Sequence, residues 1–119
     1  DNKNRENNLY NIDVKNVKKD LTNIKNFNFI FLEKILSQSI LDQINDNLAF
    51  VHLNTGDFKV EFQYFDKIIN KCLKNAILIV DNYGFLKKDD QTMYDEYLKA
   101  NQKLYSYVSP SLQLVVMVK

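Results

Sequence analysis

Two short polar segments hold the side chains that could do chemistry, and each follows an apolar run of strand length. They are residues 52–57 and residues 81–84. Their members of interest have short side chains with oxygen or nitrogen atoms: His52, Asn54, Asp57, Asp81, Asn82 and Tyr83. In open α/β sheets, ligands bind beyond the carboxyl ends of the strands. If the two apolar runs are neighbouring parallel strands, the sequence predicts that both segments meet at one site.

Oxygen-bearing side chains at such an edge could hold Mg²⁺, which prefers oxygen ligands in octahedral geometry. The candidate ligands are Asp81, Asn82 and Asn54, with Asp57 as a fourth. This set contains few formal charges, and carboxylates bind Mg²⁺ more strongly than amides do. Asn, Asp and Gly also form ordinary turns after strands, so a turn without a ligand is the alternative interpretation.

His52 is the only histidine and Cys72 the only cysteine of the chain. His52 is a candidate general base, and the alternative is a hydrogen-bonded structural histidine. We expect Cys72 to lie on the apolar stripe of a helix as a buried thiol. A single cysteine allows neither an intrachain disulfide nor a cysteine-based zinc site. The sequence also lacks a Gly-rich phosphate loop and a G-x-S-x-G motif.

Composition bounds the class of protein. The 119 residues suffice for one domain, and 45% hydrophobic residues are enough for a packed core. A net charge of +1 gives no reason to expect nucleic acid or an anionic membrane as partner. No apolar run approaches the ~18 residues of a membrane-spanning helix. The N-terminal residues are polar and show no signal peptide, so we expect a cytoplasmic protein.

The spacing of apolar residues predicts alternating helices and strands after a polar segment at residues 1–12. The predicted helices span residues 13–24, 37–44, 58–73 and 89–98, and the predicted strands span residues 27–32, 48–53, 76–80, 105–109 and 112–118. Ser37 or Ser39 would cap the second helix, and Asp89 or Asp90 the fourth.

This order predicts a single α/β domain over residues 13–119. Residues 76–80 are all apolar, so both faces of a strand there would be apolar. This is typical of a parallel strand covered by helices on both sides. The last two strands are too close in sequence for a crossover, so they must be antiparallel neighbours. We therefore expect a mostly parallel sheet with helices on both faces and a C-terminal antiparallel strand pair.

Residues 50–54 (FVHLN) and 73–84 (LKNAILIVDNYG), with the helix between them, resemble the second half of a class I S-adenosylmethionine-dependent methyltransferase. The pattern is similar to that of the macrocin O-methyltransferase-like group. In that group the fourth strand ends in h-h-D-x-D-x-Y and the fifth in D-D-Y-G, followed by a helix and an antiparallel strand pair. The resemblance covers residues 27–119. It implies a Rossmann-like sheet, S-adenosylmethionine as cofactor, and a small-molecule or sugar hydroxyl as methyl acceptor, with Mg²⁺ as a further candidate cofactor.

Some residues depart from the pattern of that group: Asn54 for Asp, Gly56 for Asp, Phe58 for Tyr, Lys74-Asn75 for Gly-Gly and Asn82 for Asp. Asp81 alone keeps a metal-type carboxylate, and Tyr83-Gly84 keeps the rest of the signature. These changes favour a divergent or metal-independent member, or a decayed copy.

The Gly-rich cofactor loop and the first strands of that fold are missing, and residue 1 is Asp. We therefore expect an incomplete methyltransferase fold, the C-terminal part of a larger domain, which alone would be inactive. The resemblance and the strand tips give the candidate catalytic and substrate-side residues: Asn54, Asp81, His52, Tyr83 and Asn82. Exposed strand edges would favour a homo-oligomer. The alternative, from another class, is a catalytically degenerate α/β module with a structural or partner-binding role.

Overall fold

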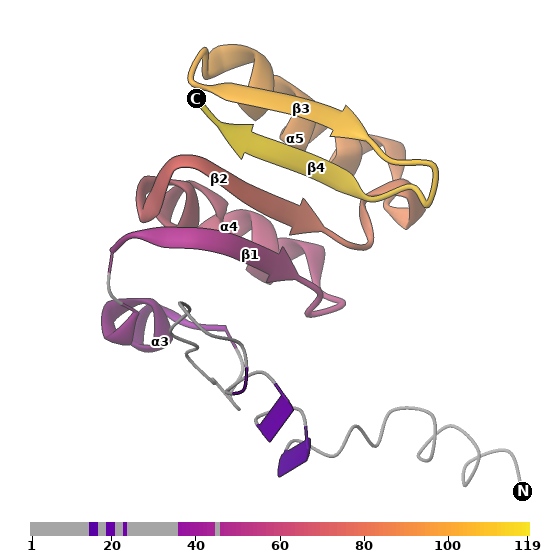
Figure 1. Ribbon diagram of the computed structural model, residues 1–119. Helices are drawn as coiled ribbons and strands as arrows, with labels where there is room; N and C mark the ends of the chain where they lie inside the picture. Colours follow the sequence, from indigo (N-terminus) through magenta and orange to yellow (C-terminus); the bar gives the residue numbers. More distant parts are fainter. Residues whose placement is uncertain (1–14, 17–18, 21–22, 24–35, 45) are drawn as a thin grey trace, which may run out of the picture. The chain divides into compact units, whose positions relative to one another are not determined.

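The computed structural model describes residues 15–16, 19–20, 23, 36–44 and 46–119 (Figure 1). The chain divides into two units, Asp1–Glu33 and Lys34–Lys119. In the first unit the described residues Lys15, Asn16, Lys19 and Asp20 are helical, as predicted. The polar segment at residues 1–12 and the predicted strand at residues 27–32 lie outside the described residues.

The second unit contains helices and strands in the predicted alternation. They are α3 Gln38–Gln43, β1 Leu48–Leu53, α4 Phe58–Asn70, β2 Cys72–Val80, the short 3₁₀ helix η1 Tyr83–Phe85, α5 Lys88–Ala100, β3 Leu104–Val108 and β4 Leu114–Val118. Every helix and strand predicted from residue 37 onward is confirmed, with shifted ends. No described helix has the length and apolar character needed to cross a membrane.

Side-chain caps explain where two of these helices begin. The Ser37 hydroxyl accepts a hydrogen bond from the Ile40 N–H at the start of α3. The Asp57 carboxylate accepts from the N–H groups of Lys59 and Val60 at the start of α4. Such oxygens satisfy N–H groups that have no partner within the helix. Ser37 is thus the residue, of the two predicted alternatives, that caps α3.

The predicted cap of α5 was wrong. Lys87 occupies the N-cap position and its side chain makes no capping bond. Asp89 and Asp90 lie in the first turn instead, where carboxylates are stabilised by the positive end of the helix dipole. The favourable charge at a helix start therefore does not fix the residue at which the helix begins.

The predicted position of Cys72 on a helix stripe was also wrong. Helix α4 ends at Asn70, and Lys71 forms its C-cap. Cys72 begins strand β2, where it pairs with Leu48. Its side chain is partly buried, and its Sγ donates to the Ile68 carbonyl oxygen at 3.3 Å. Burial raises the pKa of the Cys72 thiol, which disfavours the reactive thiolate.

The sheet has the strand order β1-β2-β4-β3. Strands β1 and β2 are parallel, whereas β4 runs antiparallel to both β2 and β3. The predicted antiparallel pairing of the last two strands is confirmed. The predicted mostly parallel sheet is wrong for the described strands, because β4 inserts between β2 and β3 and makes two of the three pairings antiparallel. Strands β1, β2 and β3 nevertheless all run in the same direction.

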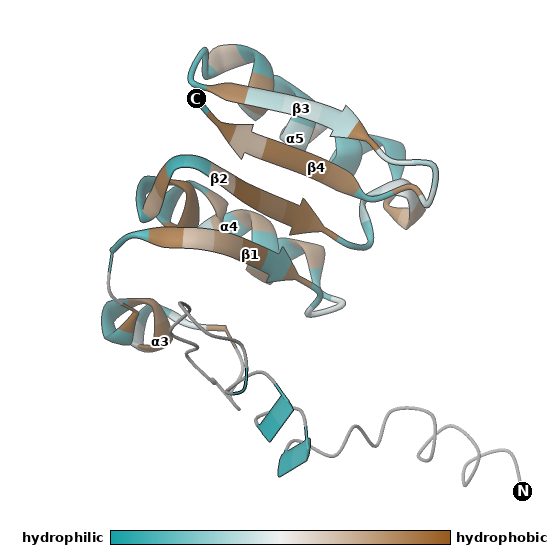
Figure 2. Cartoon of the chain, in the orientation of Figure 1, coloured by the Kyte–Doolittle hydropathy of each residue, from teal (hydrophilic) through white to brown (hydrophobic). Residues whose placement is uncertain are grey.

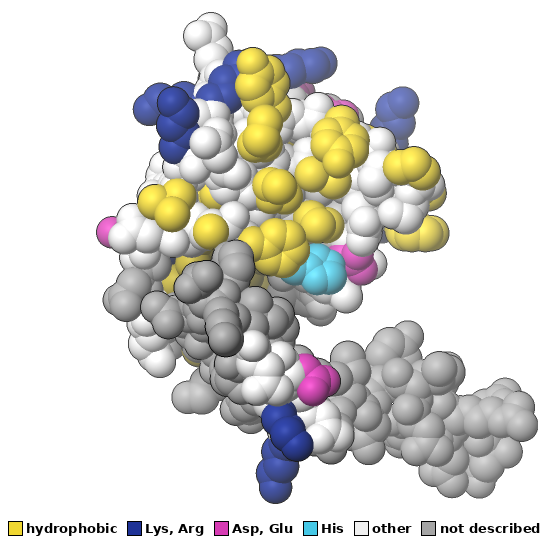
Figure 3. Space-filling view, in the orientation of Figure 1, with side chains coloured by type: hydrophobic (Ala, Val, Ile, Leu, Met, Phe, Trp, Pro, Cys, Tyr) yellow, Lys and Arg dark blue, Asp and Glu magenta, His cyan; other side chains and the backbone are white. Residues whose placement is uncertain are grey.

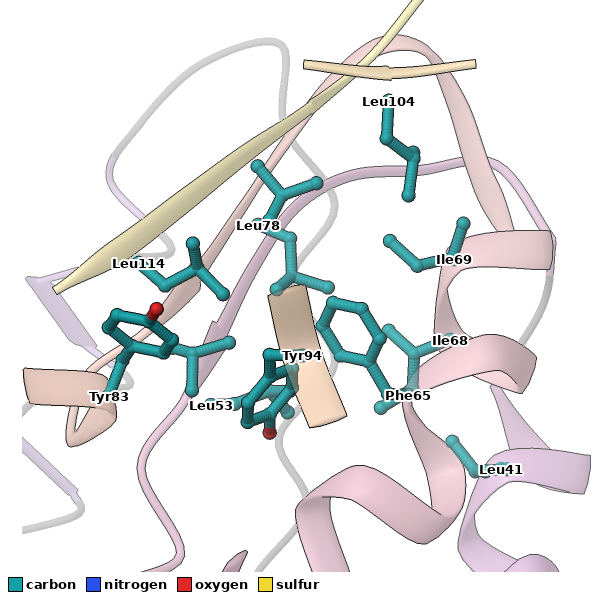
Figure 4. Close-up of a cluster of buried hydrophobic side chains, with 12 residues drawn as sticks. Leu41, Leu53, Phe65, Ile68, Ile69, Leu78, Tyr83, Tyr94, Leu104 and Leu114 are labelled. Atoms are coloured by element: carbon teal, nitrogen blue, oxygen red, sulfur yellow. The ribbon is translucent and has the colours of Figure 1, made fainter. Parts of the chain in front are cut away.

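The core lies between one face of the sheet and the helices α4 and α5, which both lie behind the sheet in Figure 1. The sheet side of this core is aliphatic: Leu53, Leu78, Val80, Leu114 and Val116. Figure 4 shows Phe65, Ile68 and Ile69 of α4 packed toward these side chains. Both long helices therefore cover the same face.

The predicted helix layers on both faces are not found among the described residues. Figure 2 shows β2 and β4 as hydrophobic along most of their length. In β2 the alternate residues Ile77 and Ile79 point away from the core, and Ile77 is exposed. The prediction that helices cover both apolar rows of β2 is therefore wrong for the described residues, because no described helix packs on the row of Ile77 and Ile79.

Tyr94 of α5 lies at the centre of the aromatic part of the core. Its ring makes edge-on contacts with Phe58, Phe62, Phe65 and Tyr83, with ring centroids 5.0–6.2 Å apart. The side chain is fully buried, and its hydroxyl has no hydrogen-bond partner in the described structure. A buried hydroxyl without a partner loses its hydration and gains nothing in return.

We expect Tyr94→Phe to raise the free energy of unfolding by about 1 kcal/mol, because it removes this unpaired hydroxyl and keeps the ring contacts. Urea unfolding followed by circular dichroism would measure the change. The matched control is Tyr97→Phe, since the Tyr97 hydroxyl donates to Asp66 Oδ1 at 2.6 Å. That control should not stabilise the chain. A loss of stability in Tyr94→Phe would show that the hydroxyl is paired.

Candidate active site

The carboxyl ends of β1 and β2 meet at one edge of the sheet, as predicted from the parallel pairing. Leu53 pairs with Val80, and the Asp81 N–H donates to the Leu53 carbonyl oxygen at 3.0 Å. The polar segments that follow the two strands are therefore neighbours. The structure brings His52, Asn54, Asp81 and Asn82 together at this edge.

His52 and Asp81 are the two titratable side chains that contact each other in this cluster. The His52 Nε2 lies 3.3 Å from Asp81 Oδ1, and the His52 side chain is 46% exposed. Asp81 Oδ1 also accepts a hydrogen bond from the Gln113 side-chain amide, which reaches it from the residue before β4. The Gln113 hydrogen bond and then the His52 hydrogen bond lower the pKa of Asp81. The carboxylate therefore stays ionised and available to hold the imidazole.

This lowered pKa predicts a pH-dependent contribution of Asp81 to stability. A carboxyl group whose pKa is lowered by folding stabilises the folded state above its unfolded pKa of ~3.9, and loses that contribution as the pH falls through the folded value. We expect Asp81→Asn to lower the free energy of unfolding near pH 7 and pH 5, and the deficit to shrink near pH 3. Urea unfolding at these three pH values would test it. A deficit that does not change with pH would contradict the prediction.

The two amides of the cluster bind each other. The Asn82 Nδ2 donates to Asn54 Oδ1 at 3.1 Å. Both side chains replace the carboxylates that the resemblance associates with metal binding. Among the described residues, no group of three or more His, Cys, Asp and Glu side chains is placed to hold a metal ion.

The donor set does not fit Mg²⁺. It offers one carboxylate, Asp81, whose Oδ1 already accepts from Gln113 and faces His52. A hard cation such as Mg²⁺ needs several oxygen ligands in near-octahedral geometry. Any chemistry at this cluster therefore depends on its protein groups.

Tyr83 lies apart from this cluster although it follows Asn82 directly. Its ring is buried in the core, as Figure 4 shows, and its hydroxyl donates to Asp95 Oδ1 at 2.7 Å. Burial, together with the Asp95 carboxylate, raises the pKa of Tyr83 to about 12. The structure therefore does not bring this predicted substrate-side residue to the cluster. Tyr83 instead anchors the turn after β2 to helix α5.

A pocket of about 310 Å³ opens beside Asn82. It is lined by Gly56, Phe58, Glu61, Asn82, Phe85 and Leu86. Glu61 is 3% exposed, and its Oε1 accepts from the Thr55 N–H at 2.6 Å and from Thr55 Oγ1 at 2.9 Å. The pocket thus combines aromatic walls with a fixed carboxylate and an amide.

Sequence reasoning missed Glu61, Gln113 and the pocket. Glu61 lies in the first turn of α4, where an acidic residue is ordinarily explained by the helix dipole. The one signal in the sequence is that Glu61 stands six residues after Thr55, on the other side of the Asp57 cap. Gln113 carried no signal, because its contact with Asp81 depends on the insertion of β4 beside β2.

Comparison with protein-family models, curated proteins and solved structures returned no match to this chain.

Proposed function

We propose that residues 34–119 form the acceptor side of an S-adenosylmethionine-dependent O-methyltransferase. The observation that carries the proposal is the pairing of His52 with Asp81 at the carboxyl end of two parallel strands. The D-N-Y-G turn, the helix that follows it and the antiparallel pair of β3 and β4 also agree with the resemblance in the sequence. Fold alone does not decide activity, so the proposal rests on the His52–Asp81 pair and the side chains around it.

The Asp81 carboxylate would hold the His52 ring by its Nε2, leaving Nδ1 as the nitrogen that takes the proton of the acceptor hydroxyl. A base positioned in this way raises the nucleophilicity of the hydroxyl oxygen. Gln113 would in turn fix the Asp81 carboxylate. S-adenosylmethionine would supply an electrophilic methyl group, and we find no residues for its binding in the described part of the chain.

The pocket beside Asn82 fits a sugar or another small polar acceptor. Its volume of about 310 Å³ lies at the lower end of the range of small-molecule sites. Phe58 and Phe85 offer apolar walls for a ring, while Glu61 and Asn82 offer hydrogen-bond partners for hydroxyl groups. Asn82 lines the pocket and directly follows Asp81, so the pocket opens at the same edge of the sheet as the His52–Asp81 pair, although His52 itself does not line it.

The test is a methyl-transfer assay with the natural polypeptide that carries residues 1–119, using S-adenosylmethionine labelled in its methyl group. Sugar and small-molecule alcohols would serve as acceptors, with and without EDTA. We expect labelled ether products at equal rates in both conditions. Transfer that EDTA abolishes would overturn the metal-independent mechanism, and cofactor binding without transfer to any hydroxyl would overturn O-methylation.

One observation favours the alternative, a catalytically degenerate module. The Asn54–Asn82 hydrogen bond joins two side chains that the resemblance assigns to metal ligation, which is the arrangement expected when that role has been lost. Calorimetric titration of the natural polypeptide with S-adenosylmethionine separates the two proposals. Absence of binding by the folded protein would favour the module.

A further inference from the structure

One face of the sheet, called here the open sheet face, presents eight side chains in register. Two rows cross the four strands in the order β1, β2, β4 and β3. The rows are Phe50, Ile77, Met117 and Tyr105, and His52, Ile79, Val115 and Tyr107. Figure 3 shows hydrophobic side chains gathered over the strands with the single histidine beside them. Within the described residues, α4 and α5 both pack on the opposite face.

The two faces of this sheet differ in composition. The helix-covered face is aliphatic, as described above for the core. The open sheet face combines Ile77, Ile79 and Val115 with Phe50, Tyr105, Tyr107 and Met117, and none of its eight residues is Asp, Glu, Lys or Arg. Strands covered by helices are rich in Val, Ile and Leu, whereas interfaces between proteins are enriched in aromatic residues and Met and depleted of charge at their centre. The composition of the open sheet face is that of an interface.

We infer that the open sheet face is the interface between two copies of this chain. Its most exposed side chains include Tyr107 at 63%, Phe50 at 60% and Tyr105 at 56%. At about 150–250 Å² for an aromatic side chain, the exposed parts of these three rings alone amount to roughly 350 Å². The largest apolar patch of a typical monomer covers ~300–600 Å², and each partner of a standard interface buries ~800 Å². The three rings alone therefore reach the size of the largest apolar patch of a typical monomer, and the other five side chains extend the face toward one side of a standard interface.

The charges around the open sheet face suit a second copy. Asp81 lies beside His52 at the carboxyl end of β1. Lys119 lies over the Tyr105 ring, 3.8 Å from its centroid, at the start of β3. These two charges occupy opposite corners of the face, so a two-fold axis can bring the acidic corner of one copy to the basic corner of the other. Such self-complementarity is what a symmetric dimer interface requires.

Sedimentation velocity of the full 119-residue chain over a range of concentrations tests this inference, which does not depend on methyl transfer. We expect a dimer with twice the monomer mass of 14.1 kDa. The double variant Phe50→Lys/Tyr107→Lys places two charges on the face and should weaken dimerisation at least about tenfold. Both side chains are largely exposed in one copy, so the variant should keep its fold.

The matched control is Met93→Lys, which places a charge at an exposed apolar position of α5, away from the open sheet face. It should dimerise as the parent chain does. A parent chain that stays monomeric overturns the inference and leaves helices of a longer polypeptide as the occupant of the face. Unchanged dimerisation of the double variant, or loss of the dimer in Met93→Lys, would place the interface elsewhere and also overturn it.

His52 provides a second readout that needs no variant, in case the double variant fails to fold. It is the only histidine of the chain and lies on the open sheet face. Its modification by diethyl pyrocarbonate can therefore be followed without interference from another imidazole. We expect the rate to fall several-fold as the protein concentration rises through the dimerisation range, and proton transfer by His52 to be confined to the monomer. A rate that does not depend on concentration overturns the inference.

Discussion

Gly84→Ala is expected to lower the free energy of unfolding by about 3 kcal/mol, because the new methyl group has no room. A Cβ at this position would lie 2.2 Å from the Leu112 Cβ and 2.8 Å from the Leu112 carbonyl oxygen. That same oxygen accepts a hydrogen bond from the Gly84 N–H at 2.8 Å. The backbone of the loop before β4 must therefore move away, which breaks the bond that holds it.

Thermal unfolding followed by circular dichroism would measure this loss, which corresponds to a fall in Tm of roughly 10–20 °C for a domain of this size. The matched control is Gly56→Ala. Gly56 has a φ of +75°, and nothing lies within 4 Å of an added Cβ. Its substitution costs only the left-handed backbone strain, about 1 kcal/mol. If the two variants lose equal stability, the close approach of Leu112 does not explain Gly84.

This result would give Gly84 a packing role within the D-N-Y-G turn. The turn lies between β2 and α5, and Gly84 lets it approach the loop that leads into β4. Gln113, the next residue of that loop after Leu112, reaches Asp81. The glycine therefore supports the position of the carboxylate without contacting a ligand.

The periodic elements of residues 37–119 could be predicted from sequence because each buries one side of a regular pattern. Helix α4 has its apolar stripe and strand β2 its apolar run. The start of β2 could not be predicted. Lys74 and Asn75 are polar residues, which in sequence indicate the end of one element and the start of another. In the structure Asn75 has a positive φ of 67°. The strand nevertheless continues, and the irregularity shifts its register against β1 between Leu48 and Phe50.

The candidate site was predictable only as far as the parallel pair of β1 and β2 determines it. Two strands that end at the same edge bring their following residues together, and the contact between Asn54 and Asn82 follows from that rule. Contacts from elements that are distant in sequence did not follow. The contact of Gln113 with Asp81 depends on the place of β4 in the sheet. Tyr83 points into the core, where Asp95 of α5 accepts a hydrogen bond from its hydroxyl.

The helix-covered and open faces of the sheet illustrate the same limit. Alternation in β2 shows that both of its rows are apolar, but it does not say what covers each row. The covered row packs on α4 and α5, whereas Ile77 remains exposed in this chain. What packs on the row of Ile77 and Ile79 depends on elements outside β2, and the apolar pattern of one strand does not specify them.

His52→Asn is expected to lower the rate of methyl transfer by the natural polypeptide about 10²–10⁴-fold, the usual contribution of a positioned general base. Asparagine keeps a polar side chain of similar reach on β1 but cannot take up the proton of a hydroxyl at neutral pH. The exposed face of the ring and its contact with Asp81 Oδ1 at 3.3 Å are the features on which this expectation depends. The loss should fall on kcat more than on KM, because the acceptor pocket is lined by other residues.

Two further variants separate a base from a merely structural histidine. Asp81→Asn keeps a side chain that can contact the ring but removes the charge that stabilises a protonated imidazole, so we expect a smaller loss in kcat. Glu96→Gln, an exposed position on α5 away from the strand tips, should leave the rate unchanged. If His52→Asn loses stability as measured by urea unfolding but keeps its kcat, His52 is a structural residue. Its contact with Asp81 would then hold the carboxyl ends of β1 and β2 together. The general base would in that case lie outside the described residues.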